Sequence, residues 1–285
     1  MKAPAFDYVK PRTLSAVFEL LASHGDEARL LAGGQTLLAT LNMRLSEPAL
    51  LIDINAIEAL KGISVHGLVL RIGALTTHSE IEASALVAEH APLLALAVPH
   101  IAHRAIRNLG TWGGSIAYAD PAAEWPCCLA ALDGVVLLRS ASGERRVAAR
   151  DFFLDLYTTA LAEGELVVAC ELPIARPGDV FRFDELARRH GDYAIVGLAL
   201  AARRVPGGLA DLRLSFLGLG TTPIRARRTE ALFEHAPFSA LRLGALMDAL
   251  LDELQPLADL TNTAATKRHL AGVLTRRLLA SALAA

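Results

Sequence analysis

The spacing of apolar residues predicts a strand, helix, strand pattern at the start of the chain. An extended segment at 6–11 (FDYVKP) precedes a helix at 14–24, which Thr13 caps and Gly25 ends. Apolar runs at 28–33 and 49–54 are typical of buried strands. Between these runs, apolar residues recur with helical spacing over 37–45. We therefore expect a βαβ-like opening.

The middle of the chain alternates between strand and helix patterns. Residues 77–110 have helical periodicity that begins at Thr77 or Ser79 and is interrupted by Pro92 and Pro99. A further helix is predicted at 120–134, with Asp120 as its N-cap and Pro121 at its first position. Strands are predicted at 67–74 and 165–173, with a hairpin at 135–140 and 143–153.

The pattern changes near 174–179 (IARPGD), where we place a domain boundary. Three strand patterns follow, with a turn at 206–208, and helical patterns then run from Ala226 to the end. The strands are expected at 179–186, 193–204 and 209–220. The order predicts an α+β fold whose second part is an antiparallel sheet with helices on one side. The predicted domains are 1–175, with parts at about 1–56 and 57–175, and 176–285.

Composition narrows the class of protein. Apolar residues make up 53% of the 285 positions and charged residues 20%, which is typical of a globular protein rather than a disordered one. A net charge of −2 gives no reason to expect nucleic acid as a partner. No apolar run is long enough to span a bilayer, and the N-terminus has no leader pattern, so we expect a cytoplasmic protein.

Two Gly-Gly pairs are the main candidate chemistry. Each follows an apolar approach, at AGGQT (32–36) and TWGGS (111–115). Without a Cβ, a glycine can adopt positive φ and lets an anion approach the main chain, where successive N–H groups form an anion-binding nest. A single pair is most often an ordinary turn, but two such pairs can hold one diphosphate. The residues alone therefore predict a plausible nucleotide or phosphate site.

Other motifs narrow the chemistry further. GxxxxGK[ST], GxGxxG, GxSxG and HExxH are absent, which disfavours P-loop, Rossmann and common hydrolase sites. Asp120 and Glu124 are expected on one face of a helix, where a carboxylate can accept ribose hydroxyls; the alternatives are a helix cap and a solvated residue. For His100 and His103 a structural or solvent-exposed role is favoured over a metal site, because no acidic residue or cysteine accompanies them and Arg104 and Arg107 would repel a cation. The three cysteines suit a reducing compartment, with Cys127 and Cys128 as buried thiols, and are too few for an iron–sulfur cluster.

The two Gly-Gly motifs belong to an ordered series that resembles the flavoprotein (medium) subunit of molybdenum hydroxylases, the group of carbon monoxide dehydrogenase and xanthine dehydrogenase. The resemblance covers nearly the whole chain. It includes FDYVKP (6–11), AGGQTLL (32–38), LIDI (51–54), IGALTTHSEI (72–81), NLGTWGGSIAYADPAAE (108–124), RRHGDYAIV (188–196) and LGLGTTPIRA (217–226). It implies a two-part FAD-binding domain like that of vanillyl-alcohol oxidase, followed by a C-terminal domain of carbon monoxide dehydrogenase flavoprotein type.

The resemblance also implies roles for individual residues. The two Gly-Gly loops would bind the diphosphate of FAD, Glu124 the flavin nucleotide, Ile101 the adenine, and Val167 would make a backbone contact near the flavin. Tyr193 matches an aromatic residue that lies beside the isoalloxazine in the carbon monoxide dehydrogenase branch; the alternative is an ordinary strand tyrosine. The implied cofactor-binding residues are Leu31, Ala32, Gly33, Gly34, Gln35, Thr36, Leu37, Ile101, Thr111, Trp112, Gly113, Gly114, Ser115, Asp120, Glu124, Val167 and Asp184, with Tyr193 as the catalytic candidate and no metal ligand.

Four positions depart from the family pattern. Thr36 stands where serine is common, Trp112 where an aliphatic residue is usual, and Lys267 where tyrosine is frequent. Asp184 stands where some relatives have a flavin-contacting lysine. No histidine or cysteine falls at a covalent-flavin position, so we expect non-covalent FAD.

The activity implied by the resemblance is an electron relay. A large subunit with the molybdenum cofactor would oxidise the substrate, and a small subunit with two [2Fe–2S] clusters would pass electrons to FAD in this chain. An external acceptor would then reoxidise the FAD, with a dimer of heterotrimers as the assembly. A quinone, a cytochrome or another carrier fits as the acceptor, because no NAD motif is present. The alternatives are a free-standing FAD-dependent oxidase or reductase and a non-redox nucleotide-binding scaffold.

Overall fold

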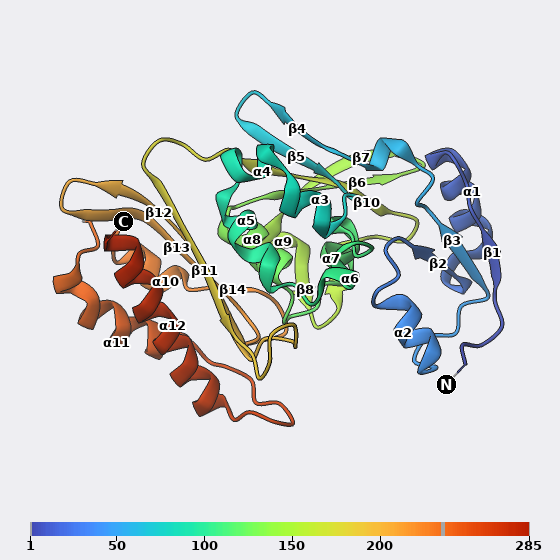
Figure 1. The fold of residues 1–285 in the computed structure, drawn as a ribbon. Coiled ribbons are helices and arrows are strands. Elements are labelled where there is room, and N and C mark those ends of the chain that lie inside the picture. Colours follow the sequence, from blue (N-terminus) through green and yellow to red (C-terminus); the bar gives the residue numbers. More distant parts are fainter. Residues whose placement is uncertain (1, 235–236, 285) are drawn as a thin grey trace.

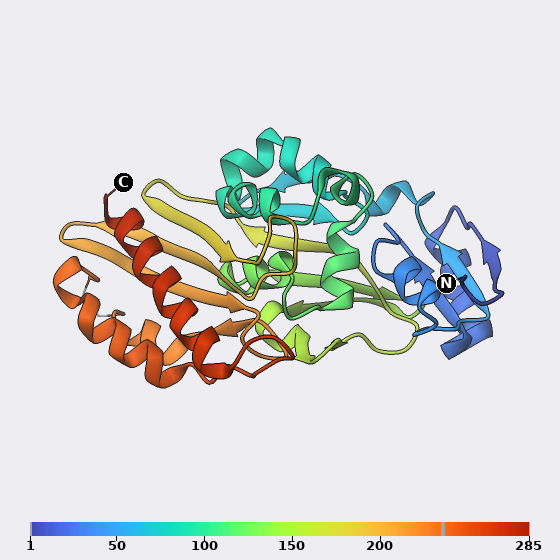
Figure 2. The same cartoon turned by 60° about the horizontal axis from the view of Figure 1, so that its bottom comes forward.

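The computed structural model describes residues 2–234 and 237–284, and three sheets follow one another along its length (Figure 1). The N-terminal and C-terminal sheets lie at opposite ends of the molecule in both views, with the five-stranded sheet between them (Figures 1 and 2). The fold contains both helices and sheets, which confirms the predicted α+β class.

The first sheet is parallel, in the order β1-β3-β2, which confirms the βαβ-like opening. Thr13 caps α1 by accepting a hydrogen bond from Ala16 N at 3.3 Å, and Gly25 ends the helix with a φ of 48°. The elements are β1 (Asp7–Val9), α1 (Leu14–His24), β2 (Ala28–Leu31), α2 (Leu37–Asn42) and β3 (Leu50–Asp53).

The second sheet is antiparallel, in the order β4-β5-β10-β6-β7. The hairpin of β6 and β7 is confirmed as far as Ala148, but the predicted second strand is too long because α9 (Ala149–Phe152) follows. Strand β4, which pairs with β5, was not predicted. The strands are β4 (Ile63–His66), β5 (Val69–Gly73), β6 (Val135–Ser140), β7 (Gly143–Ala148) and β10 (Leu166–Pro173), with the small pair β8 (Phe153–Asp155) and β9 (Thr158–Thr159) beside them.

Short helices connect β5 to β6. Thr77, one of the two predicted caps, caps α3 in a capping box with Glu80. Pro92 interrupts the helical stretch, as predicted, and begins α5. Ser84 adds an unpredicted break, because its hydroxyl caps α4. The helices are α3 (His78–Ala83), α4 (Ala85–His90), α5 (Pro92–Ala97), the 3-10 turn Val98–His100, α6 (Arg104–Arg107), α7 (Trp112–Tyr118) and α8 (Glu124–Ala131).

Helix α8 corrects a prediction. It begins at Glu124 after Ala123, and not at Pro121 after Asp120. The Asp120 carboxylate instead accepts a hydrogen bond from Ala122 N at 2.9 Å, which closes a turn ahead of the helix. Asp120 and Glu124 therefore do not share one helical face.

The third sheet is antiparallel, in the order β11-β12-β13-β14. Its own helices α10 and α12 cover one face, as predicted, while α5 and α8 pack on the other side. Strand β12 begins at Val196 and not at Tyr193, because a turn at 189–192 precedes it. The elements are β11 (Asp179–Leu186), β12 (Val196–Val205), β13 (Gly208–Leu217), β14 (Ile224–Arg225), α10 (Arg227–Ala231), α11 (Leu243–Glu253) and α12 (Ala264–Ala284).

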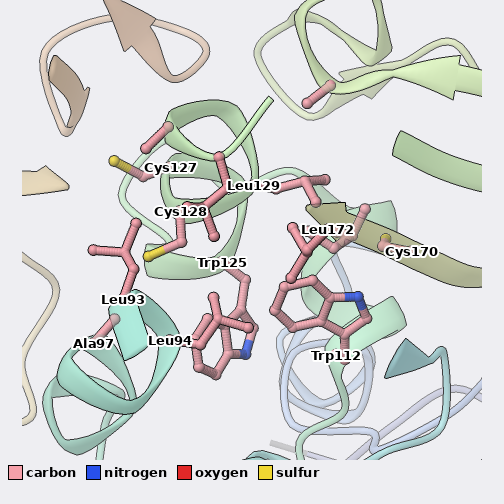
Figure 3. Packing of buried hydrophobic residues seen from close by; sticks show 14 of the residues in the cluster. Leu93, Leu94, Ala97, Trp112, Trp125, Cys127, Cys128, Leu129, Cys170 and Leu172 are labelled. Atoms are coloured by element: carbon pink, nitrogen blue, oxygen red, sulfur yellow. The ribbon is translucent and has the colours of Figure 1, made fainter. Parts of the chain in front are cut away.

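The largest apolar core joins the helices of the middle part to the third sheet. Trp112 and Trp125 are fully buried with their ring centroids 5.1 Å apart, beside the thiols of α8 (Figure 3). Phe181 and Phe183 of β11 belong to the same cluster. The core is therefore continuous across the domain boundary predicted at 174–179.

The packing of α7 on β5 generates a stability prediction. A Cβ on Gly113 would lie 2.4 Å from the Ala74 Cβ and 2.7 Å from its Cα, which real contacts do not allow. Gly113→Ala is therefore expected to lower the free energy of unfolding by about 1–3 kcal/mol through overpacking. Urea unfolding of the purified chain measures this change.

Gly244→Ala is the matched control, because Gly244 lies in α11 with open space around its Cβ position. It is expected to leave stability unchanged or to raise it by up to about 1 kcal/mol. A Gly113→Ala chain as stable as the wild type would contradict the packing argument.

Candidate functional site

The structure brings the two Gly-Gly segments together. A Cβ on Gly33 would lie 2.1 Å from the Leu109 carbonyl oxygen and 2.8 Å from the Gly110 Cα. The first segment thus rests directly on the backbone that leads into the second. A Cβ on Gly114 would lie 4.0 Å from the Ala32 Cβ, so the second segment also faces the first.

The loop at 33–36 presents free donors. Within residues 2–234 and 237–284, no acceptor pairs with the backbone N–H groups of Gly33–Thr36. Gly34 has a φ of 71°, as an anion-binding turn requires, and the Gln35 amide donates to the Gly33 carbonyl at 3.0 Å. Unpaired N–H groups of this kind are costly in a folded protein unless a ligand or water accepts from them.

Asn55 holds this loop in place, and sequence reasoning missed it. Its side-chain amide donates to the Ala32 carbonyl at 2.8 Å and to the Asp53 carboxylate at 2.7 Å. Asp53 in turn is bonded by the Tyr8 hydroxyl and by Lys10. Burial opposes the ionised form, but these hydrogen bonds together hold the pKa of Asp53 below its usual value. The one sign of this support in the sequence is the motif LIDIN (51–55), where polar residues come at the end of a buried strand.

The second Gly-Gly segment corrects the sequence interpretation. Gly113 and Gly114 lie in the first turn of α7, and neither has positive φ. Their N–H groups are also occupied: Gly113 donates to the Ala74 carbonyl at 2.8 Å and Gly114 to the Thr111 hydroxyl at 3.2 Å. Thr111 is the N-cap that pulls these residues into the helix. Free N–H groups, which such a nest requires, are found at 33–36 but not at 113–115.

A pocket of about 330 Å³ opens beside these segments. Four predicted site residues line it, namely Gln35, Thr36, Asp120 and Tyr193. Six other residues complete the wall: Ala39, Thr40, Met43, Tyr118, Ala122 and Tyr157. The rings of Tyr118 and Tyr157 pack with centroids 4.9 Å apart. No local pattern marks these two tyrosines as site residues.

The C-terminal part supports Asp120 in the pocket wall. Gly218 N donates to the carbonyl of Pro121, the next residue, at 2.8 Å. Lys267 is buried, and its Nζ donates to the Gly218 carbonyl at 2.8 Å while pairing with Asp259 at 2.9 Å. The departure at Lys267 therefore has a structural role in fixing the turn at 120–122. Burial raises the pKa of Asp120.

Glu124 is half-buried and begins α8. Burial raises the pKa of Glu124 from 4.5 to about 7, and the charge of Asp120 adds to the shift. Tyr193 lies in the connection before β12 with 72% of its surface exposed, so it is not the strand tyrosine considered as an alternative. Its side chain remains available to a ligand in the pocket.

The other predicted residues lie outside the pocket wall. Ile101 and Val167 are buried, and the Trp112 side chain is fully buried in the core. Asp184 pairs with Arg277 of α12 at 2.9 Å. Leu31 ends β2, Leu37 begins α2, and Ser115 lies in α7. Their roles toward a cofactor stay predictions.

The cysteines behave as buried thiols, as predicted. All three are free and buried, and burial raises the pKa of Cys127 and of Cys170 to about 12. His100 lies against Glu185 and Phe183, and His103 lies beside His190. No helix in the described part of the chain has the length and apolar character needed to cross a membrane.

Comparison with known proteins assigns both parts of the chain. Residues 4–175 match the FAD binding domain in molybdopterin dehydrogenase, and residues 181–282 match the CO dehydrogenase flavoprotein C-terminal domain. The chain is 37% identical over 284 residues to 6-hydroxypseudooxynicotine dehydrogenase complex subunit alpha of Paenarthrobacter nicotinovorans, which covers 99% of this chain and 96% of the relative.

Two solved structures have nearly the same fold. Carbon monoxide dehydrogenase from Hydrogenophaga pseudoflava, in a form lacking the Mo-pyranopterin moiety of its molybdenum cofactor, matches with a TM-score of 0.95 at 34% identity, covering 99% of this chain and 98% of that one. Quinoline 2-oxidoreductase from Pseudomonas putida 86 matches with a TM-score of 0.94 at 34% identity, covering 100% and 99%. The chain therefore belongs to the FAD-binding medium subunits of the molybdenum hydroxylase family and is an oxidoreductase subunit.

Proposed function

We propose that this chain binds FAD non-covalently in the pocket beside the two Gly-Gly segments and relays electrons from a partner subunit to an external acceptor. The observation that carries the proposal is the set of free N–H groups at Gly33–Thr36, beside a pocket that Gln35 and Thr36 line. A diphosphate supplies the acceptors that these donors lack. The residues present therefore fit FAD.

Each part of the pocket suits one part of the cofactor. The main chain at 33–36 would hold the diphosphate, and the Ser115 hydroxyl lies on the facing helix. Asp120 and Glu124 would accept from hydroxyl groups, and Tyr193 would lie against the ring system. Bound FAD supplies a carrier that accepts two electrons and releases them to a different partner. The chain's own task is to bind it and to keep the redox-active ring accessible.

The electron source is proposed from the relatives. They are named as a complex subunit and as medium chains, which fits a chain that performs one step of a multi-subunit reaction. We propose a large subunit with the molybdenum cofactor and a small subunit with [2Fe–2S] clusters as partners, in a dimer of heterotrimers. The buried free thiols favour the cytoplasm as its location.

Asn55 generates a prediction about FAD affinity. Asn55→Ala removes the donor that fixes the Ala32 carbonyl, so the loop at 33–36 loses its support. The Kd for FAD is expected to rise by roughly 5- to 30-fold, equivalent to about 1–2 kcal/mol, because one hydrogen bond is lost and its acceptor is left unpaired. Fluorescence titration of the flavin-free chain with FAD measures the change.

Asn262→Ala is the matched control, since the hydrogen bonds of Asn262 to other described residues all lie within the exposed turn at 259–262. Its Kd is expected to equal that of the wild type. Equal FAD affinity in Asn55→Ala and Asn262→Ala would remove Asn55 from the site.

Tyr193 generates a prediction about flavin reoxidation. Because this side chain is exposed at the pocket, Tyr193→Phe is expected to retain full FAD content but to change the rate at which reduced flavin is reoxidised. Stopped-flow absorbance of the reconstituted complex measures both half-reactions. Unchanged reduction and reoxidation rates would exclude a role for the Tyr193 hydroxyl.

The relay itself is tested by purifying the chain from its native host. We expect iron- and molybdenum-containing subunits to co-purify with it, and an oxidised organic substrate of the complex to bleach the bound flavin. A chain that is isolated alone with FAD and oxidises a substrate by itself would favour the free-standing enzyme instead. A chain whose flavin no donor reduces would favour the scaffold.

A further inference from the structure

Gly218 touches both backbone segments that carry Asp120 and Tyr193, two residues of the pocket wall. It follows β13 and has a φ of 79°, a conformation that favours glycine. Its N–H donates to the carbonyl of Pro121, the residue after Asp120, at 2.8 Å. A Cβ on Gly218 would lie 2.5 Å from the carbonyl oxygen of Ile195, two residues after Tyr193, so the two main chains are in direct contact. Gly218 is therefore a common support for both pocket residues.

Lys267 holds Gly218 from α12. Its side chain is only 8% exposed, and its Nζ donates to the Gly218 carbonyl at 2.8 Å. The second partner of Nζ is the Asp259 carboxylate, at 2.9 Å in the turn before α12. Hydrogen bonds from Lys267, and then from Thr261 and Asn262, hold the pKa of Asp259 below its usual value, so this carboxylate is ionised. The ammonium group is thus fixed between a carboxylate and the Gly218 carbonyl.

The position of Gly218 depends on this contact. Within residues 2–234 and 237–284, Lys267 is the one donor that reaches the Gly218 carbonyl. A hydrogen bond from a charged donor is stronger than one from a neutral donor, and the paired Asp259 compensates the charge of the ammonium group. Lys267 does not line the pocket. Its route to a ligand there is through Gly218 and the two segments that Gly218 supports.

We propose that Lys267 is a positioning residue for FAD, which through Gly218 sets the places of Asp120 and Tyr193 at the pocket. The inference rests on the proposed binding of FAD in this pocket, and it adds a side chain of the C-terminal domain to that site. It is independent of the partner that supplies electrons and of the acceptor that removes them.

Both pocket residues depend on this support. The Asp120 carboxylate is oriented by the turn at 120–122, and Tyr193 by the connection that leads into β12. If Gly218 shifts, the acceptor for hydroxyl groups and the tyrosine ring both move relative to the loop at 33–36. A misplacement of about 1 Å is enough to impair the reaction of a positioned ligand. Loss of the Lys267 donor is therefore expected to change FAD affinity and flavin reoxidation together.

Lys267→Met tests the proposal in the protein as it is isolated from its native host, after its flavin has been removed. Methionine keeps the length of the side chain but has no donor, and Asp259 retains its bonds from Thr261 and Asn262. The Kd for FAD is expected to rise by at least about fivefold, because the Gly218 carbonyl is left unpaired. The rate of flavin reoxidation at saturating FAD, measured by stopped-flow absorbance, is expected to change by at least about twofold.

Arg182→Met is the matched control. Arg182 Nη2 donates to the Ser281 carbonyl at 2.9 Å, near the other end of α12, so this change also removes a link between the third sheet and α12. Both variants are expected to unfold at a lower urea concentration, but Arg182→Met is expected to keep the wild-type Kd and reoxidation rate. A wild-type Kd in Lys267→Met, or an equal rise in both variants, would overturn the proposal. A wild-type protein that binds no FAD would instead refute the proposed function itself.

Lys267→Tyr and Lys267→Phe separate the lost donor from changes in packing and charge. The two rings fill nearly the same space and both lack the ammonium charge, but only tyrosine, which is frequent at this position in the family, has a donor. Lys267→Tyr is expected to bind FAD at least about threefold more tightly than Lys267→Phe, because its hydroxyl can restore the bond to Gly218. Equal Kd values in the two variants would show that a donor at this position does not set the site, and would overturn the proposal.

Discussion

The site depends on a backbone contact that only glycine permits. Gly33 lies so close to the Leu109 carbonyl that any Cβ would overlap it. This contact joins the parallel sheet at the N-terminal end to the segment that begins α7. It also fixes the start of the loop at 33–36, whose N–H groups have no partner in the described chain. A larger residue at Gly33 would therefore push the N-terminal sheet away from the segment that begins α7, whether or not a ligand is bound.

All three sheets contribute to the candidate FAD site around this contact. The first sheet supplies the loop and its support by Asn55, and the middle part supplies α7 and the turn at Asp120. The third sheet reaches the same turn through Gly218, which Lys267 holds from α12. The middle part and the third sheet share one continuous core, which fixes the positions of these groups relative to one another. FAD binding is thus a property of the whole chain, even though the Gly-Gly motifs lie in its first half.

Local signals predicted much of this fold. Thr13 and Thr77 cap their helices because capping needs only the next few residues, and the turn of β6 and β7 likewise depends on adjacent positions. The predicted start of α8 is wrong because the Pro121 carbonyl accepts a hydrogen bond from Gly218 N, and Gly218 is far away in the sequence. The predicted nest at the second Gly-Gly pair is wrong because the sequence does not show that Ala74 and Thr111 accept from its N–H groups.

The remaining site residues had no readable pattern. Tyr118 and Tyr157 come together only through the packing of α7 beside the β8–β9 hairpin. The family resemblance supplied Tyr193, which the residue pattern alone could not assign, and it extended to the flavin nucleotide the ribose-binding role that the pattern gave Glu124.

Backbone amide hydrogen exchange with and without FAD tests the account most directly. If the free N–H groups at 33–36 bind the diphosphate, their exchange is expected to slow by roughly tenfold or more when FAD is added. The amides of Gly113 and Gly114, which are already bonded, are expected to change much less. Unchanged exchange at 33–36 in the FAD-saturated chain would contradict the account.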